Sequence, residues 1–321
     1  MKKFLFCSFI FIFSFLFGKE PYITITVSQD GKSDFISIQE AINSTRDLGP
    51  SEAIIIIKNG IYKEKIIIPS NKHQLTLKGE NSEKTIITNS DFSGKIDSFT
   101  NQKMTTFTSY TVLVNGENTK IENLTIQNTH CEKGQAVALH VEGDKFIGKN
   151  LRLLGCQDTL YTATNNSRQY YENCYIEGTT DFIFGQATAI FKNCIIKSLA
   201  NSFITAAATD KNNSYGYVFF DCTLTAKENI DKVYLGRPWR PYAKTVFINT
   251  EMGNHILPQG WNEWSGDKMF PDKEKTAYYA EFGSKGKGAN ISQRVKWSHQ
   301  LKQNDLKNYT IEKIFREWIP E

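Results

Sequence analysis

The sequence predicts an all-β fold in which short strands stack as the coils of a β-solenoid. Three observations lead to this expectation. Short β-branched runs recur between turn residues in the first third of the chain, a loose repeat occupies the middle, and helical patterns are confined to the two ends. A β-sandwich is the rival fold, and it is less favoured because Asn-Gly turns do not recur at hairpin spacing.

The first 18 residues resemble a targeting segment. Met1–Lys3 carries positive charge, Phe4–Phe17 is almost entirely apolar, and Gly18 supplies a small residue before a polar stretch. This pattern is typical of a secretory signal peptide, and the apolar run is too short to span a membrane. We therefore expect cleavage near Gly18, export of the mature chain to the periplasm or beyond the cell without a membrane anchor, and one domain over residues 19–321. An uncleaved anchor is the alternative.

The mature chain begins with one helical pattern among short strands. Phe35, Ile38 and Ile42 share one helical face, and Asp34 precedes them as a candidate N-cap. β-Branched or alternating runs bounded by turn residues indicate strands. These runs are Tyr22–Val27, Ala53–Ile57, Lys65–Pro69, Leu75–Gly79 and Thr85–Thr88.

A repeated unit of the form apolar-x-Asn-small/apolar-x-apolar follows. Its Asn or Asp occurs at intervals of 27, 23, 20, 28 and 28 residues, at Asn123, Asn150, Asn173, Asn193, Asp221 and Asn249. One unit is too short to bury its inner face alone, so neighbouring units should stack. We expect the asparagines at equivalent turns, where their side chains could form a ladder. The unequal intervals predict loops of different length, and such loops commonly carry sites.

The pattern loosens after Gly253. Gly260–Trp264 and Tyr278–Phe282 are aromatic and strand-like. A helical cap is expected at the C-terminus, from the apolar residues Leu301, Leu306, Ile311, Ile314, Phe315 and Trp318. No stretch has the composition of an interdomain linker, which favours a single domain.

Charge and cysteine content exclude several classes of protein. The net charge is only +4, without a dense basic block, so nucleic acid is not an expected partner.

Five cysteines follow the predicted signal peptide. An odd number argues against a scaffold held by disulfides, and the sequence has no Cys-x-x-Cys pair that would suggest a zinc site. Cys174, Cys194 and Cys222 share one phase of the repeat and should stack in the interior. If one bridge forms in the exported protein, we expect Cys194–Cys222.

Two aspartates, Asp158 and Asp181, lie in apolar and aromatic surroundings 23 residues apart. A carboxylate in such surroundings is costly unless it is paired or hydrogen-bonded. Because 23 residues match about one coil of the repeat, both should lie on one face, with strands about 4.8 Å apart. A carboxylate pair with divergent pKa values suits acid–base or nucleophilic chemistry. The alternative is that both aspartates merely occupy turns.

Two glutamines extend this face. Gln135 lies 22 residues before Gln157, which directly precedes Asp158. Three successive coils would then present Gln135, Gln157 with Asp158, and Asp181. The amides could donate to a developing oxyanion while one carboxylate attacks and the other handles the proton, which indicates acyl transfer. No Gly-x-Ser-x-Gly motif supports a Ser-His-Asp triad.

The stretch Leu235–Trp239 adds a cation and an aromatic ring. The guanidinium of Arg237 can hold a carboxylate through two hydrogen bonds, and Trp239 can stack on a sugar ring. A structural salt bridge is the alternative for Arg237, and a core position is the alternative for Trp239. Trp261 and Trp264 are equally compatible with the core and with a site.

Five stretches together resemble the pectin methylesterase (pectinesterase) family of carbohydrate esterases. They occur in the family's order and span most of residues 22–297, at Gly60–Glu64, Gly134–Leu139, Gln157–Tyr161, Gly178–Gly185 and Leu235–Trp239. The resemblance implies a right-handed parallel β-helix. It also implies an enzyme that removes methyl groups from the carboxylates of polygalacturonan, with pectin as its substrate, methanol as a product, and no metal or other cofactor.

The resemblance assigns roles position by position. Asp181 would be the nucleophile and Asp158 the acid/base, while Gln157, helped by Gln135, would stabilise the oxyanion. The implied substrate-binding residues are Thr106, Gln135, Arg237 and Trp239, of which Arg237 would also contact Asp181. Thr180 is a departure, because many relatives have Val before the nucleophile.

Other functions remain as alternatives. A pectate lyase on the same solenoid would use clustered carboxylates for calcium, and a polygalacturonase would space its carboxylates for a water. Neither arrangement stands out in the sequence. A non-catalytic carbohydrate-binding solenoid is disfavoured because the set Gln157, Asp158, Asp181 and Arg237 is intact. We expect the mature protein to be a monomer.

Overall fold

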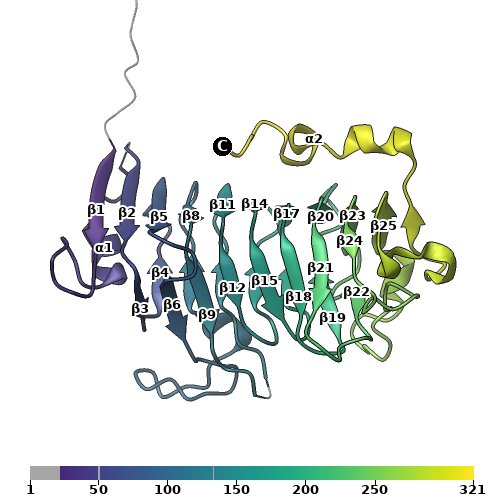
Figure 1. Ribbon diagram of the computed structural model, residues 1–321, viewed down its shortest axis with the longest axis horizontal. Helices are drawn as coiled ribbons and strands as arrows, with labels where there is room; N and C mark the ends of the chain where they lie inside the picture. The colour runs from purple at the N-terminus through teal and green to yellow at the C-terminus, as the bar shows by residue number, and fades with distance from the viewer. Residues whose placement is uncertain (1–21, 50, 133) are drawn as a thin grey trace, which may run out of the picture.

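The computed structural model describes residues 22–49, 51–132 and 134–321, and the predicted signal peptide at residues 1–18 lies outside this part. Three parallel sheets run along one long axis (Figure 1), and the chain visits them in turn in each coil. The protein is a right-handed parallel β-helix, as the resemblance implied. Its interior is one apolar cluster that runs from Val27 to Tyr279.

Sheet A has 11 strands in the order β1 (Ile23–Val27), β2 (Ala53–Ile57), β5 (Leu75–Gly79), β8 (Lys120–Glu122), β11 (Phe146–Lys149), β14 (Arg168–Glu172), β17 (Thr188–Lys192), β20 (Tyr217–Phe220), β23 (Lys244–Ile248), β25 (Tyr278–Phe282) and β26 (His299–Gln300). Sheet B has eight strands, β3 (Gly60–Tyr62), β6 (Thr85–Asn89), β9 (Thr125–Asn128), β12 (Arg152–Leu154), β15 (Tyr175–Gly178), β18 (Ile195–Ser198), β21 (Thr223–Ala226) and β24 (Glu251–Met252). Sheet C has seven, β4 (Ile66–Ile68), β7 (Val112–Val114), β10 (Leu139–Val141), β13 (Leu160–Thr162), β16 (Ile183–Gly185), β19 (Phe203–Ala207) and β22 (Tyr234–Pro238).

The repeated Asn or Asp occupies the corner between sheet A and sheet B in each coil. All six have left-handed backbone conformations, with φ from 51° to 59°, a region that Asn and Asp enter more readily than most residues. The backbone N–H of each donates to a carbonyl of the next coil, as from Asn150 to Glu172 and from Asn173 to Lys192, both at 3.0 Å. The equivalent turns are therefore confirmed. A side-chain ladder is not, because no hydrogen bond joins two of these side chains in the described part of the chain.

Side chains of one phase stack along the interior, since parallel strands pair in register. The rings of Tyr171, Phe191, Phe219 and Phe247 form one such column, with successive centroids 4.9, 4.5 and 4.4 Å apart. Stacked rings exclude water from the centre of the helix and hold the coils at a fixed spacing.

The N-terminal helix begins later than the sequence pattern indicated. Helix α1 spans Ile38–Ser44, and its N-cap is Ser37, whose side chain accepts a hydrogen bond from the N–H of Glu40. Asp34, the expected cap, instead accepts hydrogen bonds from the N–H and hydroxyl of Thr26. Glu64 accepts hydrogen bonds from the N–H groups of Ile38 and Gln39 at the first turn. A carboxylate from the next coil therefore fixes where the helix starts.

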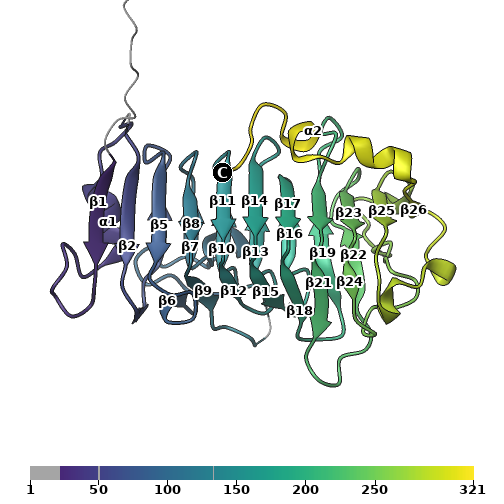
Figure 2. The same cartoon turned by 45° about the horizontal axis from the view of Figure 1, so that its top comes forward.

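The C-terminal segment is helical but does not cap the end of the β-helix. The segment contains the 3₁₀ helix η5 (Gln303–Asn308) and the α-helix α2 (Ile311–Phe315). Short 3₁₀ helices also occur earlier in the chain, at η1 (Thr106–Thr108), η2 (Lys273–Lys275), η3 (Lys287–Ala289) and η4 (Ile291–Gln293). Figure 2 shows this segment running back across sheet A. Ile314 and Phe315 pack there against Tyr170, Ile190 and Val218, which point outward from the sheet. Those outward apolar residues explain the direction of the segment.

The strand expected at Gly260–Trp264 is absent, although Tyr278–Phe282 is β25 as expected. Trp261 forms only an isolated bridge to Gly236, and its ring is fully buried against Phe247 and Tyr279. The stretch therefore folds as a loop whose first aromatic residue enters the core.

The expected bridge Cys194–Cys222 is wrong. Cys174, Cys194 and Cys222 are buried free thiols that stack as predicted, and their Sγ atoms face backbone carbonyls. Parallel Cβ vectors in register leave Cβ atoms about 4.8 Å apart, beyond the roughly 3.8 Å that a disulfide prefers. The disulfide instead joins Cys131 to Cys156, which ties the loop before Gln135 to the residue before Gln157.

We expect non-reducing peptide mapping to find Cys131 linked to Cys156, with the other three thiols alkylated only after unfolding because each is 1% exposed. Replacing Cys131 and Cys156 together by serine should lower the free energy of unfolding, measured with denaturant, by about 3 kcal/mol, because the loop between them loses its closure. A map that shows Cys194 joined to Cys222, or five free thiols, would contradict this assignment.

Candidate active site

The predicted site residues lie where successive coils enter sheet C. Gln135 lies shortly before β10, Gln157 and Asp158 before β13, and Asp181 before β16, while Arg237 lies within β22. Strands β10, β13 and β16 are adjacent and parallel, with Leu139 beside Leu160 and Leu160 beside Ile183. One corner of three consecutive coils therefore presents both amides and both carboxylates.

Both aspartates take the left-handed backbone conformation, with φ of 66° at Asp158 and 49° at Asp181. Each backbone N–H is used by the stacking, since Asp158 donates to Thr180 at 3.1 Å and Asp181 donates to Phe203 at 2.9 Å. The two carboxyl groups consequently stand at equivalent positions one coil apart. The hydroxyl of Thr180 lies 2.8 Å from that of Ser202 in the next coil.

Arg237 holds Asp181 through two parallel hydrogen bonds. Its Nε donates to Oδ1 at 3.0 Å and its Nη2 donates to Oδ2 at 2.7 Å. Strand β19 separates β22 from β16, and in it Ala206 pairs with Arg237 on one side and with Phe184 on the other. Asp181 donates its N–H to Phe203 of β19, and the guanidinium lies against the ring of Phe203, so the arginine crosses β19 to reach the carboxylate.

Two aromatic rings hold the guanidinium in this position. Its Cζ lies 3.9 Å from the ring centroid of Phe203 and 3.7 Å from that of Trp264. A planar cation between two rings is restricted in orientation and partly desolvated, both of which strengthen its pairing with a carboxylate. The salt bridge of Arg237 is thus part of the pocket rather than a remote structural contact.

The two carboxyl groups differ in electrostatic surroundings. Burial and the nearby charge of Asp181 raise the pKa of Asp158 well above its ordinary value, although the charge of Arg237 opposes this rise. Burial also raises the pKa of Asp181, but the hydrogen bonds and charge of Arg237 oppose that rise. The positive charge of Arg237 in the sequence predicts a lowered pKa for Asp181, but the pKa is raised, because burial outweighs the ion pair. The pKa of Asp158 is raised further, so Asp158 is the weaker acid.

The amides of Gln135 and Gln157 are free to bind a ligand. Both residues are partly exposed, and neither side chain hydrogen-bonds to another described residue. Their NH₂ groups can therefore donate to an oxygen that enters the pocket.

All seven predicted site residues line one pocket of about 220 Å³. The lining residues are Thr106, Phe107, Gln135, Gln157, Asp158, Asp181, Phe184, Ala206, Arg237, Trp239 and Trp264. Thr106 opens η1 and Trp239 directly follows β22. The pocket thus combines a carboxylate pair, two amides and a guanidinium with several aromatic rings.

An aromatic surface flanks the carboxylates on the outer face of sheet C. Tyr161 and Phe184 are stacked with centroids 4.6 Å apart, and Trp239 meets Phe184 edge-on at 5.8 Å. Trp239 is only partly buried, so its site position is favoured over the core. Tyr161 and Phe184 are buried, so the partly exposed Trp239 is the ring of this group that suits the apolar face of a sugar.

Four lining residues were not among the predicted site residues, namely Phe107, Phe184, Ala206 and Trp264. Phe107 and Trp264 come from loops rather than from the repeat, so their position in the chain gave no signal of the pocket. The sequence left Trp261 and Trp264 equally compatible with the core and with a site, and the structure places Trp261 in the core and Trp264 in the pocket lining.

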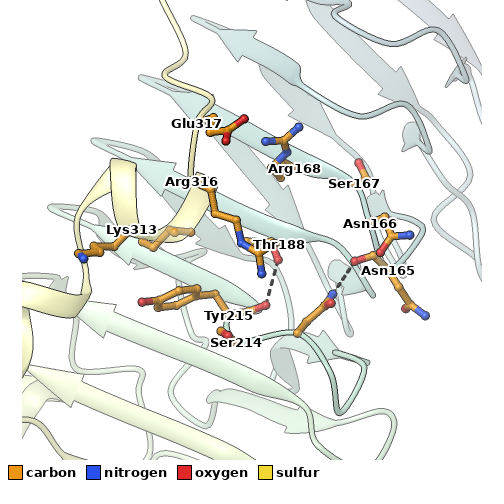
Figure 3. A pocket seen from close by; sticks show the side chains of 12 residues that line it. Asn165, Asn166, Ser167, Arg168, Thr188, Ser214, Tyr215, Lys313, Arg316 and Glu317 are labelled. Atoms are coloured by element: carbon orange, nitrogen blue, oxygen red, sulfur yellow. Dashed lines mark hydrogen bonds between the residues drawn. The ribbon is translucent and has the colours of Figure 1, made fainter.

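A larger pocket of about 690 Å³ lies elsewhere, between α2 and the strand starts of β14 and β17 (Figure 3). Figure 3 shows mainly amides, hydroxyls and the cations Arg168, Lys313 and Arg316 around it, and Glu317 is its only carboxylate. It offers no nucleophile with a neighbouring acid or base, so the smaller pocket is the candidate active site. The described residues hold no group of three or more His, Cys, Asp or Glu placed to bind a metal ion.

No helix in the described ranges is both long enough and apolar enough to cross a bilayer.

The comparisons with known proteins identify the family. A family model described as Pectinesterase matches residues 24–317. Pectinesterase 31 of Arabidopsis thaliana is 36% identical over 290 residues, which cover 89% of this chain and 90% of that protein. Probable pectinesterase/pectinesterase inhibitor 13 of the same plant is 36% identical over 310 residues, which cover 92% of this chain but 48% of that protein. The chain thus spans about half the length of some curated relatives.

Solved structures agree with this result. A pectin methylesterase solved in complex with hexasaccharide VII has a TM-score of 0.82 and 31% identity, with 92% of this chain and 98% of that one covered. Sequence, fold and pocket therefore lead to one conclusion: the chain belongs to the pectinesterase family, whose members are carboxylic ester hydrolases.

Proposed function

We propose that this protein hydrolyses the methyl esters of polygalacturonan (pectin) to free acid and methanol, through an acyl-enzyme formed on Asp181. The observation that carries the proposal is the pairing of two unlike carboxyl groups in one pocket. Asp181 is bound by Arg237 in two hydrogen bonds, while Asp158, with a pKa raised further, has no such partner. The relative solved with a hexasaccharide supports a sugar polymer as the ligand.

In the first step, a carboxylate oxygen of Asp181 attacks the carbonyl carbon of the methyl ester. The carbonyl oxygen becomes an oxyanion, and the NH₂ groups of Gln157 and Gln135 donate hydrogen bonds to it. The bond to the methoxy oxygen then breaks. Asp158, protonated at the start, gives its proton to that oxygen, so methanol leaves and the galacturonyl group remains esterified to Asp181.

In the second step, the ionised Asp158 removes a proton from a water molecule. The resulting hydroxide attacks the acyl carbon, and the bond to Asp181 breaks. The products are the free galacturonic acid, the carboxylate of Asp181 and protonated Asp158, which restores the starting state of the enzyme. The released acid then loses its proton to solvent. Arg237 serves both steps, because it aligns the attacking carboxylate and stabilises it again when it leaves.

The substrate would lie across the aromatic surface beside the carboxylates. Trp239 provides a ring for a sugar face, and Thr106 lines the same pocket with a hydroxyl. Export of the chain is also part of the proposal, and it is supported by the disulfide between Cys131 and Cys156, since such bonds persist in oxidising compartments.

The first expected outcome concerns the product. On highly methylated pectin, methanol and free acid should form together while the viscosity falls only slowly. Unsaturated ends that absorb in the ultraviolet, or a rapid fall in viscosity without methanol, would instead favour a lyase or a chain-cleaving hydrolase.

The second concerns the two aspartates. Asp181→Asn should abolish turnover by removing the attacking group, whereas Asp158→Asn keeps a hydrogen-bond donor but not a base, so some acylation should survive while deacylation stalls. Single-turnover methanol release separates these effects. The assignment is reversed if Asp181→Asn, free of wild type and of deamidated protein, shows a burst that Asp158→Asn lacks.

The third concerns pH. Activity should fall as the pH drops through the pKa of Asp181, which must be ionised, and as the pH rises through that of Asp158, which must be protonated.

A fourth expected outcome concerns Arg237. Arg237→Lys keeps the charge but loses the planar guanidinium that forms two hydrogen bonds with Asp181. The variant should lower kcat/KM by about a hundredfold. It should also move the acidic limb of the pH profile to higher pH, because Arg237 no longer lowers the pKa of Asp181 against the effect of burial. An unmoved limb would show that Arg237 does not set the ionisation of Asp181.

A further inference from the structure

A buried lysine next to the candidate active site has no part in the steps above. Lys273 is the first residue of η2, and its side chain is 0% exposed. Its Nζ donates to Oδ2 of Asp267 at 2.7 Å and to the carbonyl oxygen of Trp239 at 3.4 Å. Burying an ammonium group is unfavourable unless the charge is paired and hydrogen-bonded, and here both conditions are met beside the pocket.

The same ammonium group lies against the ring of Trp264. Nζ of Lys273 is 4.3 Å from the ring centroid, and Cζ of Arg237 is 3.7 Å from the same centroid. One tryptophan therefore contacts both the buried lysine and the arginine that binds the nucleophile. Since a ring attracts cations through its faces, each contact favours a fixed ring orientation.

The backbone of Trp264 needs such support. Its φ is 58°, in the left-handed region that a bulky residue rarely enters. Its N–H donates to Oδ1 of Asn262 at 2.8 Å, which holds the turn locally. A strained conformation persists only where the surroundings impose it, and strain of this kind concentrates at functional sites.

We propose that Lys273 is a positioning residue: paired with Asp267, it holds the ring of Trp264 against the guanidinium of Arg237 and so keeps Arg237 paired with Asp181. This inference rests on the proposed function, because it assigns a role in the same site. The path runs through three direct contacts, from Lys273 to Trp264, from Trp264 to Arg237, and from Arg237 to Asp181.

Lys273 also affects the nucleophile through its charge. Its positive charge acts with that of Arg237 to lower the pKa of Asp181 against the effect of burial. Burial lowers the pKa of Lys273 itself, and Asp267 opposes this. The charged groups facing Lys273 are Asp267, Arg240 and Arg237, and Asp181 faces Arg237, Lys273 and Asp158. Removal of the lysine charge should therefore make Asp181 harder to ionise.

The test compares Lys273→Met, which keeps the length of the side chain without its charge, with Lys273→Arg, which keeps the charge. Lys275→Met is the matched control, because Lys275 lies in the same 3₁₀ helix but is exposed and pairs only with the exposed Asp272. We expect Lys273→Met to lower kcat for methanol release by about tenfold or more and to shift the acidic limb of the pH profile upward by roughly half a pH unit or more. Lys273→Arg should recover most of both losses, and Lys275→Met should match wild type.

A merely structural lysine would give a different result. Lys273→Met would then reduce the melting temperature or the yield of folded enzyme, while the folded fraction kept the wild-type kcat and pH profile, and this outcome would overturn the inference. Acrylamide quenching of tryptophan fluorescence provides a readout without turnover. Lys273→Met should make one tryptophan more accessible to acrylamide than in wild type. This gain should be absent when Lys273→Met is compared with wild type in a Trp264→Phe background. If wild type releases no methanol, the proposed function fails by itself, and the quenching result still decides whether Lys273 holds Trp264.

Discussion

The structure depends on in-register stacking of coils whose corners are fixed by residues in the left-handed conformation. A lone coil leaves the backbone N–H and C=O groups of its strands unpaired, and only the neighbouring coils satisfy them. Asn150 and Asn173 show how a corner is set, since each turns the chain from sheet A to sheet B and donates its N–H to the next coil. Stacking then gives every coil the same orientation, and a side chain at one corner has a counterpart one strand spacing away.

That constraint makes the carboxylate pair possible. Asp158 and Asp181 are brought together by the same stacking that aligns the interior rings, and both are about 6–7% exposed. Two carboxyl groups in such a place cannot both be ionised cheaply, so they differ in how readily they lose a proton. Arg237 makes Asp181 the stronger acid, because it forms two hydrogen bonds with that carboxylate and opposes the rise in its pKa that burial causes.

The loops complete what the repeat begins. The disulfide from Cys131 to Cys156 anchors the loop before Gln135, and Trp264 contributes a ring that packs on Arg237. Lys273 contacts this ring and also donates to the backbone carbonyl of Trp239, another lining residue. The walls of the site are therefore held by contacts between loops, whereas its chemical groups are held by the sheet.

The sequence alone determined the solenoid, its repeating corner and the meeting of Gln135, Gln157, Asp158 and Asp181, because strand patterns and one-coil spacings are local or periodic. Arg237, Trp239 and Thr106 have no such spacing, and it was the family resemblance that implied their place in the site. Only the tertiary structure decided which cysteines bond, where α1 begins, which way the C-terminal segment runs, and that Phe107 and Trp264 join the site. Each of these depends on contacts between residues without a fixed spacing: Glu64 on the first turn of α1, outward apolar residues of sheet A beneath Phe315, and Lys273 against Trp264. The raised pKa of Asp181 also depends on the tertiary structure. Burial is a property of the folded molecule, and here its effect on the pKa outweighs that of the ion pair with Arg237, which the sequence could suggest.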